Sequence, residues 1–426
     1  MSCYYQTNAG PAAPYPVLDG DIAARVCVVG GGFAGLYSAL GLVERGVSDV
    51  VLLEAEQIGY GASGRNGGFV FAGYSLGERS LLNALGPARA RHWYSRTVEA
   101  VNLIRARIAR YAINCDVVDA GVLWANWFKD SQILLSRQKL LAESYGSTWQ
   151  WLERSELQAQ LKSDRYSAAL YERNALHLQP LKLARGWARV LRAAGVRVYE
   201  QSPAQQLNRT GQSWQVKTAA GSVNAEHVVI AGGGYLGDWA PRLRRALLPI
   251  ATYVMSTEPL GARLSDSVNT NAAVYDSRFA FDYYRALPDS RLLWGGRISV
   301  RDRPAHEVAR LLKQDLLKVY PQLGEVHIEH AWSGLMSYAR HEMPQVGQLE
   351  PGLWYAQAFG GHGLAPTCVA GETLAAAIAE QDKAYLELAR FGLSPCFGTL
   401  GLAAAQINYS WLQARDAWKA QREAQP

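Results

Sequence analysis

Three glycines near the N-terminus have the spacing of a loop that binds phosphate groups. Gly30, Gly32 and Gly35 form a G-x-G-x-x-G pattern directly after the mostly apolar run 25–29. Gly30 permits a tight turn, Gly32 lets the backbone approach a diphosphate, and Gly35 lets a helix pack on a strand. Glu54 follows about 20 residues later, where a carboxylate accepts from both ribose hydroxyls and repels a 2′-phosphate. We therefore predict a dinucleotide site here rather than a purely structural turn.

The elements that must position this site can be recognised from the apolar pattern. Residues 25–29 (RVCVV) are rich in β-branched side chains, which predicts a buried parallel strand. Apolar residues then recur at helical spacing over 33–43, and Gly46 lies just past the expected helix end. The run 50–53 (VVLL) predicts a second buried strand. A strand–helix–strand unit therefore begins the fold.

A second glycine-rich stretch, 59–68 (GYGASGRNGG), follows the Glu54 strand. A nicotinamide dinucleotide needs no second close approach of the backbone at this point. A longer flavin dinucleotide, extended into a domain interface, does need one. The pair of glycine-rich segments therefore favours FAD over NAD.

The composition describes a well-packed chain with a mild positive charge. Of 426 residues, 49% are apolar and 19% are charged, and the formal net charge is +6. At roughly 150 residues per domain, this length predicts two or three domains. No cluster of Lys and Arg with interleaved aromatic residues is present, so we do not expect nucleic acid as a partner.

The cysteines and the apolar runs indicate the compartment. The five cysteines are odd in number, widely spaced and without a C-x-x-C pair, which excludes a disulfide framework or a zinc ribbon. We expect no metal site and a reducing, cytoplasmic location. The N-terminus has no apolar h-region and no run of 18 apolar residues occurs, so we expect neither a signal peptide nor an integral membrane segment.

The pattern of the first 68 residues resembles a known family. Segment 26–68, with Glu54 and the 59–68 loop, resembles the FAD-dependent amine and amino-acid oxidases of the D-amino acid oxidase superfamily. Within it the gamma-glutamylputrescine oxidoreductase branch is most similar, with glycine oxidase and sarcosine oxidase as cousins. The likeness covers most of the chain from about residue 15. It includes the segments 257–260, 276–297, 332–334 and 359–364.

The resemblance implies a fold of α/β plus α+β type. It is a glutathione-reductase-type FAD-binding domain interleaved with a substrate domain of antiparallel sheet and helices. This agrees with the α/β pieces that recur at the start, middle and end of the chain. We assign residues 1–20 to an irregular arm, 21–75, 165–245 and 336–395 to the FAD-binding domain, 76–164 and 246–335 to the substrate domain, and 396–426 to a C-terminal helix.

The resemblance also implies which residues contact a non-covalently bound FAD. They are Gly30, Gly32, Phe33, Ala34, Gly35, Glu54, Ala62, Ser63, Arg65, Asn66, Gly67, Gly68, Gly232, Gly361, His362, Gly363 and Leu364. Segment 361–364 directly precedes the last α/β helix, whose N-terminal N–H groups would stabilise negative charge on the reduced ring. His362 can contact the ring by its side chain or by its backbone alone. We expect His177 to be structural.

Two arginines are candidates to bind a substrate carboxylate through paired hydrogen bonds. Arg340 follows the 332–334 segment, although a surface ion pair also explains it. Arg285 ends the Tyr283-Tyr284-Arg285 run. In a strand, Tyr283 and Arg285 face one side and Tyr284 the other. One of these faces should look at the flavin, where a Tyr serves as lid or hydrogen-bond donor unless it is a core aromatic.

The resemblance implies oxidation of a C–N bond in an amine or amino acid, by hydride transfer to flavin N5. Gamma-glutamylated polyamines and N-substituted glycines are the expected substrates. A 2-hydroxy-acid dehydrogenase and a non-catalytic FAD-bound interaction protein are the alternatives. Segment 276–297 lacks the Lys that sarcosine oxidases use with oxygen, so either oxygen or another acceptor remains open. The amphipathic stretch 402–418 either docks on the protein's own surface or touches a membrane.

Overall fold

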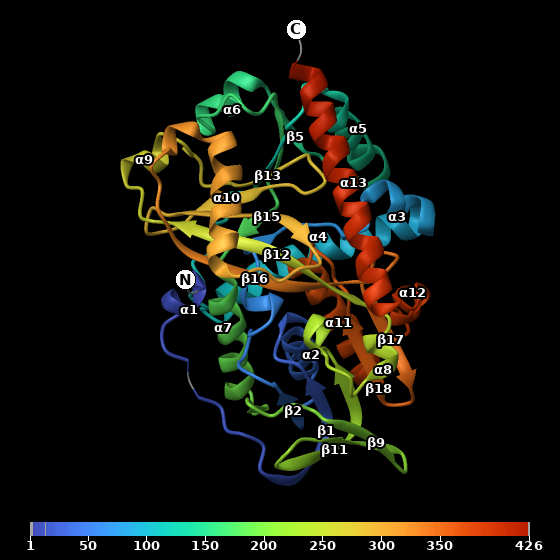
Figure 1. The fold of residues 1–426 in the computed structure, drawn as a ribbon. Helices are drawn as coiled ribbons and strands as arrows, with labels where there is room; N and C mark the ends of the chain where they lie inside the picture. The colour runs from blue at the N-terminus through green and yellow to red at the C-terminus, as the bar shows by residue number, and fades with distance from the viewer. Residues whose placement is uncertain (1–2, 13, 425–426) are drawn as a thin grey trace.

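The computed structural model describes residues 3–12 and 14–424. Two eight-stranded sheets form the centre of the molecule, together with a small two-stranded sheet. Figure 1 shows the first sheet at the bottom of the view, at β1, β2 and β11, and the second above it, at β12, β15 and β16. The chain enters each sheet more than once, so segments far apart in the sequence lie together.

The first sheet has the strand order β17-β18-β11-β1-β2-β8, with β10 and β9 paired outward from β11. Its central strands β18, β11, β1, β2 and β8 run parallel. The predicted strand–helix–strand unit is confirmed as β1, α2 (Phe33–Glu44) and β2. The strands are β1 (Gly20–Val29), β2 (Val50–Leu53), β8 (Arg197–Tyr199), β9 (Gln206–Thr210), β10 (Ser213–Lys217), β11 (Gly221–Ile230), β17 (Gln345–Glu350) and β18 (Leu353–Gln357).

Helix α2 packs against α11 (Leu364–Glu380) beside this sheet (Figure 1). Both helices are buried along most of their length, which explains why their sequences are apolar on nearly every face. Glycines permit the close approach. A Cβ atom at Gly371 would lie 2.6 Å from the backbone carbon of Tyr37, and one at Gly41 would lie 2.8 Å from the Cβ of Ala375.

The second sheet has the order β16-β12-β15-β14-β13-β4-β6-β5 and is antiparallel except between β13 and β4. Its register pairs Trp124 with Tyr275, Tyr275 with Tyr283, and Val122 with Glu172. Directly paired residues share a face, so these side chains lie on one side of the sheet. The strands are β4 (Val122–Ala125), β5 (Gln150–Leu152), β6 (Ala169–Glu172), β12 (Leu248–Thr257), β13 (Ala273–Asp276), β14 (Tyr283–Ala286), β15 (Leu292–Ser299) and β16 (Ile328–Tyr338).

The other elements cover and connect the two sheets, with α10 over β12 and β16 (Figure 1). The small sheet pairs β3 (Phe69–Val70) with β7 (Leu176–His177). The remaining helices are α3 (Glu78–Leu85), α4 (Pro87–Arg110), α5 (Gln132–Leu140), α6 (Arg154–Gln160), α7 (Pro180–Ala193), α8 (Pro241–Arg244), α9 (Ala262–Ser265), α10 (Ala305–Val319) and α12 (Tyr385–Ala389), with short turns η1 (Ala62–Gly64), η2 (Leu141–Tyr145), η3 (Gly233–Tyr235) and η4 (Pro321–Leu323).

Two segments differ from the domain assignment made from the sequence. The N-terminal arm is not irregular throughout, because α1 (Tyr4–Asn8) is a helix whose Tyr5 is fully buried and donates from its hydroxyl to the Asn66 carbonyl. Strand β6, assigned by sequence to the segment 165–245, pairs with β4 and β5 in the second sheet. Apolar periodicity predicts a strand but does not indicate which sheet it joins.

The predicted C-terminal helix is present as α13 (Gly398–Ala424) and lies along one side of the molecule (Figure 1). One face docks on the protein, where the Asp416 carboxylate accepts from Phe279 N–H and Lys419 pairs with Asp130. The opposite face exposes apolar side chains, including Trp411 and Trp418. Over the described residues, no helix has the length and apolar character needed to cross a membrane. All five cysteines are free and buried.

Candidate functional site

The glycine-rich turn between β1 and α2 has no room for side chains. Gly30 has a φ of +118°, and a Cβ there would lie 2.6 Å from the Ala231 carbonyl oxygen. A Cβ at Gly35 would overlap the Gly30 carbonyl, so glycine is required for the helix to meet the strand. A Cβ at Gly32 would lie 3.0 Å from Ser63 Oγ. Packing within the protein thus requires glycine at Gly30 and Gly35, whereas Gly32, beside the Ser63 hydroxyl, leaves the backbone bare for the close approach that a diphosphate needs.

The N-terminus of α2 and Glu54 supply the polar groups of this turn. The cap residue Gly32 offers no side chain to the first helical turn, and Phe33 N–H donates to Ser63 Oγ at 2.9 Å. The Glu54 carboxylate accepts from Gly31 N–H at 2.6 Å and from Glu56 N–H at 2.9 Å. Burial raises the pKa of Glu54, and these two bonds oppose that effect. Glu54 thus lies beside the diphosphate turn, as ribose binding requires.

The 59–68 loop is held in one shape by its own side chains. Asn66 donates to the carbonyls of Ala62 and Ser63 at 3.0 and 2.9 Å, and its Oδ1 accepts from Gly68 N–H at 2.8 Å. Gly68 has a φ of +81°, and a Cβ there would overlap the Leu178 carbonyl. The predicted contact residues of this loop are therefore rigidly placed beside the α2 turn.

Arg285 is part of the support of this loop, which corrects its predicted role as substrate anchor. Its side chain is only 1% exposed. Nε donates to the Gly67 carbonyl and Nη2 donates to the Leu178 carbonyl, both at 2.8 Å. Nη1 lies 3.4 Å from Nδ1 of His177. The guanidinium therefore forms its hydrogen bonds inside the protein, because the carbonyls of Gly67 and Leu178 accept from it.

His177 has the structural position that we expected. Its Nε2 donates to the Asn271 carbonyl at 2.9 Å. Burial, followed by the adjacent Arg285, lowers the pKa of His177 to about 3. The imidazole is therefore neutral and accepts at Nδ1 from Arg285.

The two tyrosines of β14 lie on opposite faces, as strand alternation predicts. Tyr284 is a core aromatic, stacked on Trp294 with ring centroids 4.4 Å apart and with its hydroxyl 2.9 Å from that of Tyr320. This position corrects its inclusion among the site residues, because it faces away from the glycine loops. The Tyr283 ring lies against the 59–68 loop, where a Cβ at Gly67 would lie 2.5 Å from it.

Arg340 lies at the surface just after β16. Its side chain is exposed, and its guanidinium is 5.7 Å from the centre of the Phe397 ring. The structure therefore places it beside the start of α13. Its role in binding a substrate carboxylate stays a prediction.

The segment before α11 brings the C-terminal glycines to the second sheet. Gly363 caps α11 without a side chain, which leaves the N–H groups of Leu364 and Ala365 available, whereas Pro366 in the same turn has no N–H. Nε2 of His362 donates to the Phe71 carbonyl at 3.0 Å, and burial lowers the pKa of His362 to about 4. The neutral side chain is thus anchored to the protein, which favours a backbone contact with the flavin. A Cβ at Gly232, at the end of β11, would lie 2.8 Å from Leu236 Cδ1.

An aromatic face lines the second sheet next to His362. We define it as Phe71, Trp124, Tyr275, Phe281 and Tyr283. Tyr275 lies at its centre, with ring centroids 5.5 Å from Phe71, 5.7 Å from Phe281 and 6.3 Å from Trp124. Phe281 is 38% exposed. This face can pack on the apolar part of a substrate and attract a cation through its ring faces.

A buried ionic cluster adjoins the aromatic face, and sequence analysis missed it. Arg137 lies between the Trp124 and Trp149 rings, 4.4 and 4.7 Å from their centres. It donates to Glu78 at 2.7 Å and to the Tyr275 hydroxyl at 3.1 Å. Its members come from α3, α5 and β13, so no spacing along the chain connects them. The high density of tryptophans in this part of the sequence was the sole signal.

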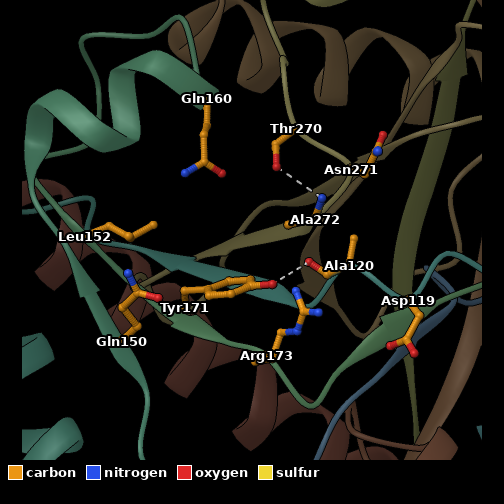
Figure 2. A pocket seen from close by; sticks show the side chains of 10 residues that line it. All are labelled: Asp119, Ala120, Gln150, Leu152, Gln160, Tyr171, Arg173, Thr270, Asn271 and Ala272. Carbon is orange, nitrogen blue, oxygen red and sulfur yellow. Dashed lines mark hydrogen bonds between the residues drawn. The ribbon is translucent and has the colours of Figure 1, made fainter.

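A separate open groove lies at the edge of the second sheet (Figure 2). Its volume is about 400 Å³. Figure 2 shows Gln160, Thr270 and Leu152 around its opening, with Tyr171 donating to the Ala120 carbonyl. Its charged members, Asp119 and Arg173, are exposed. It contains none of the glycine-loop residues, and we do not assign it to the catalytic site.

Comparison with known proteins places the chain in a family. Residues 25–377 match the family described as "DAO: FAD dependent oxidoreductase". The chain is 39% identical over 422 residues to gamma-glutamylputrescine oxidoreductase from Escherichia coli (strain K12), covering 97% of this chain and 98% of the relative. The crystal structure of glycine oxidase from Geobacillus kaustophilus superposes with a TM-score of 0.72 at 21% identity, over 87% of this chain and 98% of that one. The chain therefore belongs to the DAO family of FAD-dependent oxidoreductases, and FAD is its cofactor.

Proposed function

We propose that this oxidoreductase acts on the C–N bond of an amine or amino acid, with gamma-glutamylated polyamines and N-substituted glycines as first candidates. The observation that carries the proposal is the aromatic face beside the N-terminus of α11. It offers an apolar, cation-attracting surface next to the segment that would hold the flavin ring. The 39% identical relative is named for gamma-glutamylputrescine.

In this proposal the first sheet and its helices form a glutathione-reductase-type FAD-binding domain. The second sheet, with α10, forms the substrate domain, interleaved with the first in sequence. The FAD would be held non-covalently by the turn 30–35, Glu54, the loop 62–68, Gly232 and the segment 361–364. A Cβ atom at Gly363 would meet nothing within 4 Å, and one at Gly32 would meet only the Ser63 side chain, so the backbone at these two positions is open to such a ligand. When bound, FAD supplies the acceptor for a hydride from the substrate carbon.

The protein's own groups would position and stabilise the reaction. The free N–H groups and positive dipole end of α11 would stabilise negative charge on the ring. His362 would add no charge, because its imidazole is neutral and bonded to Phe71. Tyr283, fixed against the 59–68 loop, would contact the ring or the substrate. A substrate carboxylate would be bound by Arg340, and oxygen or another acceptor would complete turnover.

Anaerobic flavin bleaching tests this function. Purified holoenzyme is mixed with N-methylglycine, 1,4-diaminobutane, gamma-glutamylputrescine and a 2-hydroxy acid, and absorbance near the flavin maximum is followed. We expect bleaching by at least one amine and none by the hydroxy acid. Bleaching by the hydroxy acid alone would replace the proposal with a hydroxy-acid dehydrogenase. No bleaching by any compound would favour a non-catalytic FAD-bound protein.

A further inference from the structure

Buried polar atoms without a hydrogen-bond partner gather beside the aromatic face. Within the described part of the chain, they include Glu172 Oε2, Arg137 Nε and Trp149 Nε1, and beside them lies the Tyr94 hydroxyl, which interacts with the Ser147 side chain. Glu172 is 4% exposed and Tyr94 is 1% exposed. An unpaired buried polar atom costs free energy, so such a group is a place where a ligand or ordered water is expected.

These atoms belong to one cluster although they come from four different parts of the chain. Arg137 of α5 lies over the Trp149 ring. Glu172, at the end of β6, interacts electrostatically with Arg137 and with Tyr94 of α4. Arg137 and Trp149 present donors, so the two atoms able to accept from a cation are Glu172 Oε2 and the Tyr94 oxygen.

When Glu172 is ionised, the charged groups Glu78, Arg137 and Glu172 together carry a net negative charge. Arg137 is already paired with Glu78 at 2.7 Å. His362 is neutral, because burial lowers its pKa to about 4. The Glu172 carboxylate would thus be a second negative charge without a cation of its own. A buried carboxylate in that position is costly unless a positive charge joins it.

The protonation of Glu172 agrees with this deficit. Burial raises the pKa of Glu172 to about 8, with Glu78 adding to the rise, while Arg137 and a backbone hydrogen bond at Ala72 oppose it. The hydroxyls of Tyr94 and Tyr275 are the other titratable groups that interact with it. At neutral pH and without substrate, Glu172 therefore keeps its proton, and the net charge of the cluster is zero.

The Glu172 side chain also lies on the same face of the second sheet as the aromatic residues. Its partner in the register is Val122, two residues before Trp124, so both side chains share the face of Tyr275. Ala72, which bonds the Glu172 carboxylate, directly follows Phe71. Phe71 in turn accepts from His362. The carboxylate thus lies beside the segment 71–72, whose Phe71 carbonyl accepts from His362.

We propose that Glu172, assisted by the Tyr94 hydroxyl, forms an ammonium subsite for the end of the substrate remote from the oxidised C–N bond. The ligand class is an amine with a second, cationic amino group, such as a diamine or polyamine derivative. This inference rests on the proposed amine oxidation. The aromatic face would contact the methylene chain between the two nitrogens, and the ammonium would complete the charge of the cluster.

The test compares two substrates of equal chain length on the holoenzyme, 1,4-diaminobutane and butylamine. We expect the unmodified enzyme to have a lower KM for the diamine. Glu172→Gln should raise the diamine KM at least tenfold, change kcat less than twofold and leave the butylamine KM unchanged. Tyr94→Phe should raise the diamine KM less. Glu342→Gln is the control, because its carboxylate also has a raised pKa but lies at an exposed position outside the cluster.

Two further measurements separate this role from a structural one. The diamine KM should fall as pH rises through about 8, because Glu172 ionises there, and Glu172→Gln should abolish this step. The diamine should also raise the melting temperature of the dithionite-reduced holoenzyme, where no turnover occurs, and fail to do so in Glu172→Gln.

The outcomes distinguish the two proposals. If no amine bleaches the flavin of the unmodified enzyme, the proposed function fails. If amines bleach it and both variants keep the diamine KM, the subsite is overturned and the cluster holds ordered water. If Glu172→Gln loses FAD or fails to fold, the test depends on Tyr94→Phe and on the pH profile of the unmodified enzyme. An unchanged diamine KM in Tyr94→Phe, together with no pH step in the unmodified enzyme, refutes the subsite.

Discussion

Replacing Arg285 with methionine separates a role in the protein interior from a role in substrate binding. The side chain is 1% exposed and donates to the carbonyls of Gly67 and Leu178, both at 2.8 Å. Arg285→Met keeps much of the apolar volume and removes the donors. The two carbonyls then lose their partners, while Leu178 N–H still donates to the Gly68 carbonyl at 2.9 Å.

The magnitude follows from these two bonds. Hydrogen bonds that involve a charged group contribute about 1.5–3 kcal/mol each. Removing the buried guanidinium also removes its desolvation cost, which offsets part of this loss. We therefore expect a net loss of about 2–4 kcal/mol in the free energy of unfolding. Because Gly67 and Gly68 belong to the loop expected to bind FAD, cofactor affinity should fall as well.

The assay combines melting temperature, FAD content after dilution, and steady-state KM. Arg285→Met should lower the melting temperature and the FAD content, while enzyme saturated with FAD keeps its KM. Arg154→Met is the control, because Arg154 and Asp164 form an ion pair in which both side chains are exposed, and such pairs contribute little. A KM raised more than tenfold with unchanged melting temperature and FAD content would refute our assignment and restore Arg285 as substrate anchor.

Four other predictions follow from the site. Glu54→Gln should weaken FAD binding by about 1–3 kcal/mol, measured by titrating apoprotein, and undiminished affinity would exclude the ribose role. Acid or heat should release free flavin into the supernatant, since no Cys follows Trp332 in the 332–336 segment; flavin that stays with the precipitate would show a covalent bond. Arg340→Ala should raise the KM of carboxylate-bearing amines at constant FAD content, and an unchanged KM would remove the carboxylate anchor. Glu172 has a folded-state pKa of about 8 against an ordinary 4.5, so the unfolded chain loses this proton first. Stability relative to Glu172→Gln should therefore fall as pH rises from about 4.5 to about 8, and a pH-independent difference in denaturant unfolding would contradict this.

The amino-acid sequence was sufficient for the dinucleotide turn and for its ligand class. Glycine at Gly30 and Gly35 is required by local backbone geometry and by contacts between neighbouring elements. Glu54 directly follows a strand whose apolar run is visible in four consecutive residues. Each of these signals depends on residues close together in the chain, so periodicity and spacing express them directly.

The roles of the arginines and acids depended on the tertiary structure. An arginine such as Arg285 has the chemistry to bind a carboxylate. The sheet register and the docking of β7 instead direct its donors to the carbonyls of Gly67 and Leu178. Glu78, Arg137 and Glu172 come from α3, α5 and β6, which are far apart in the chain: Arg137 pairs with Glu78, and β6 brings Glu172 into the second sheet. A charged side chain has one identity in the sequence, whereas its function depends on burial and partners. These are long-range properties of the packed chain, and local pattern does not encode them.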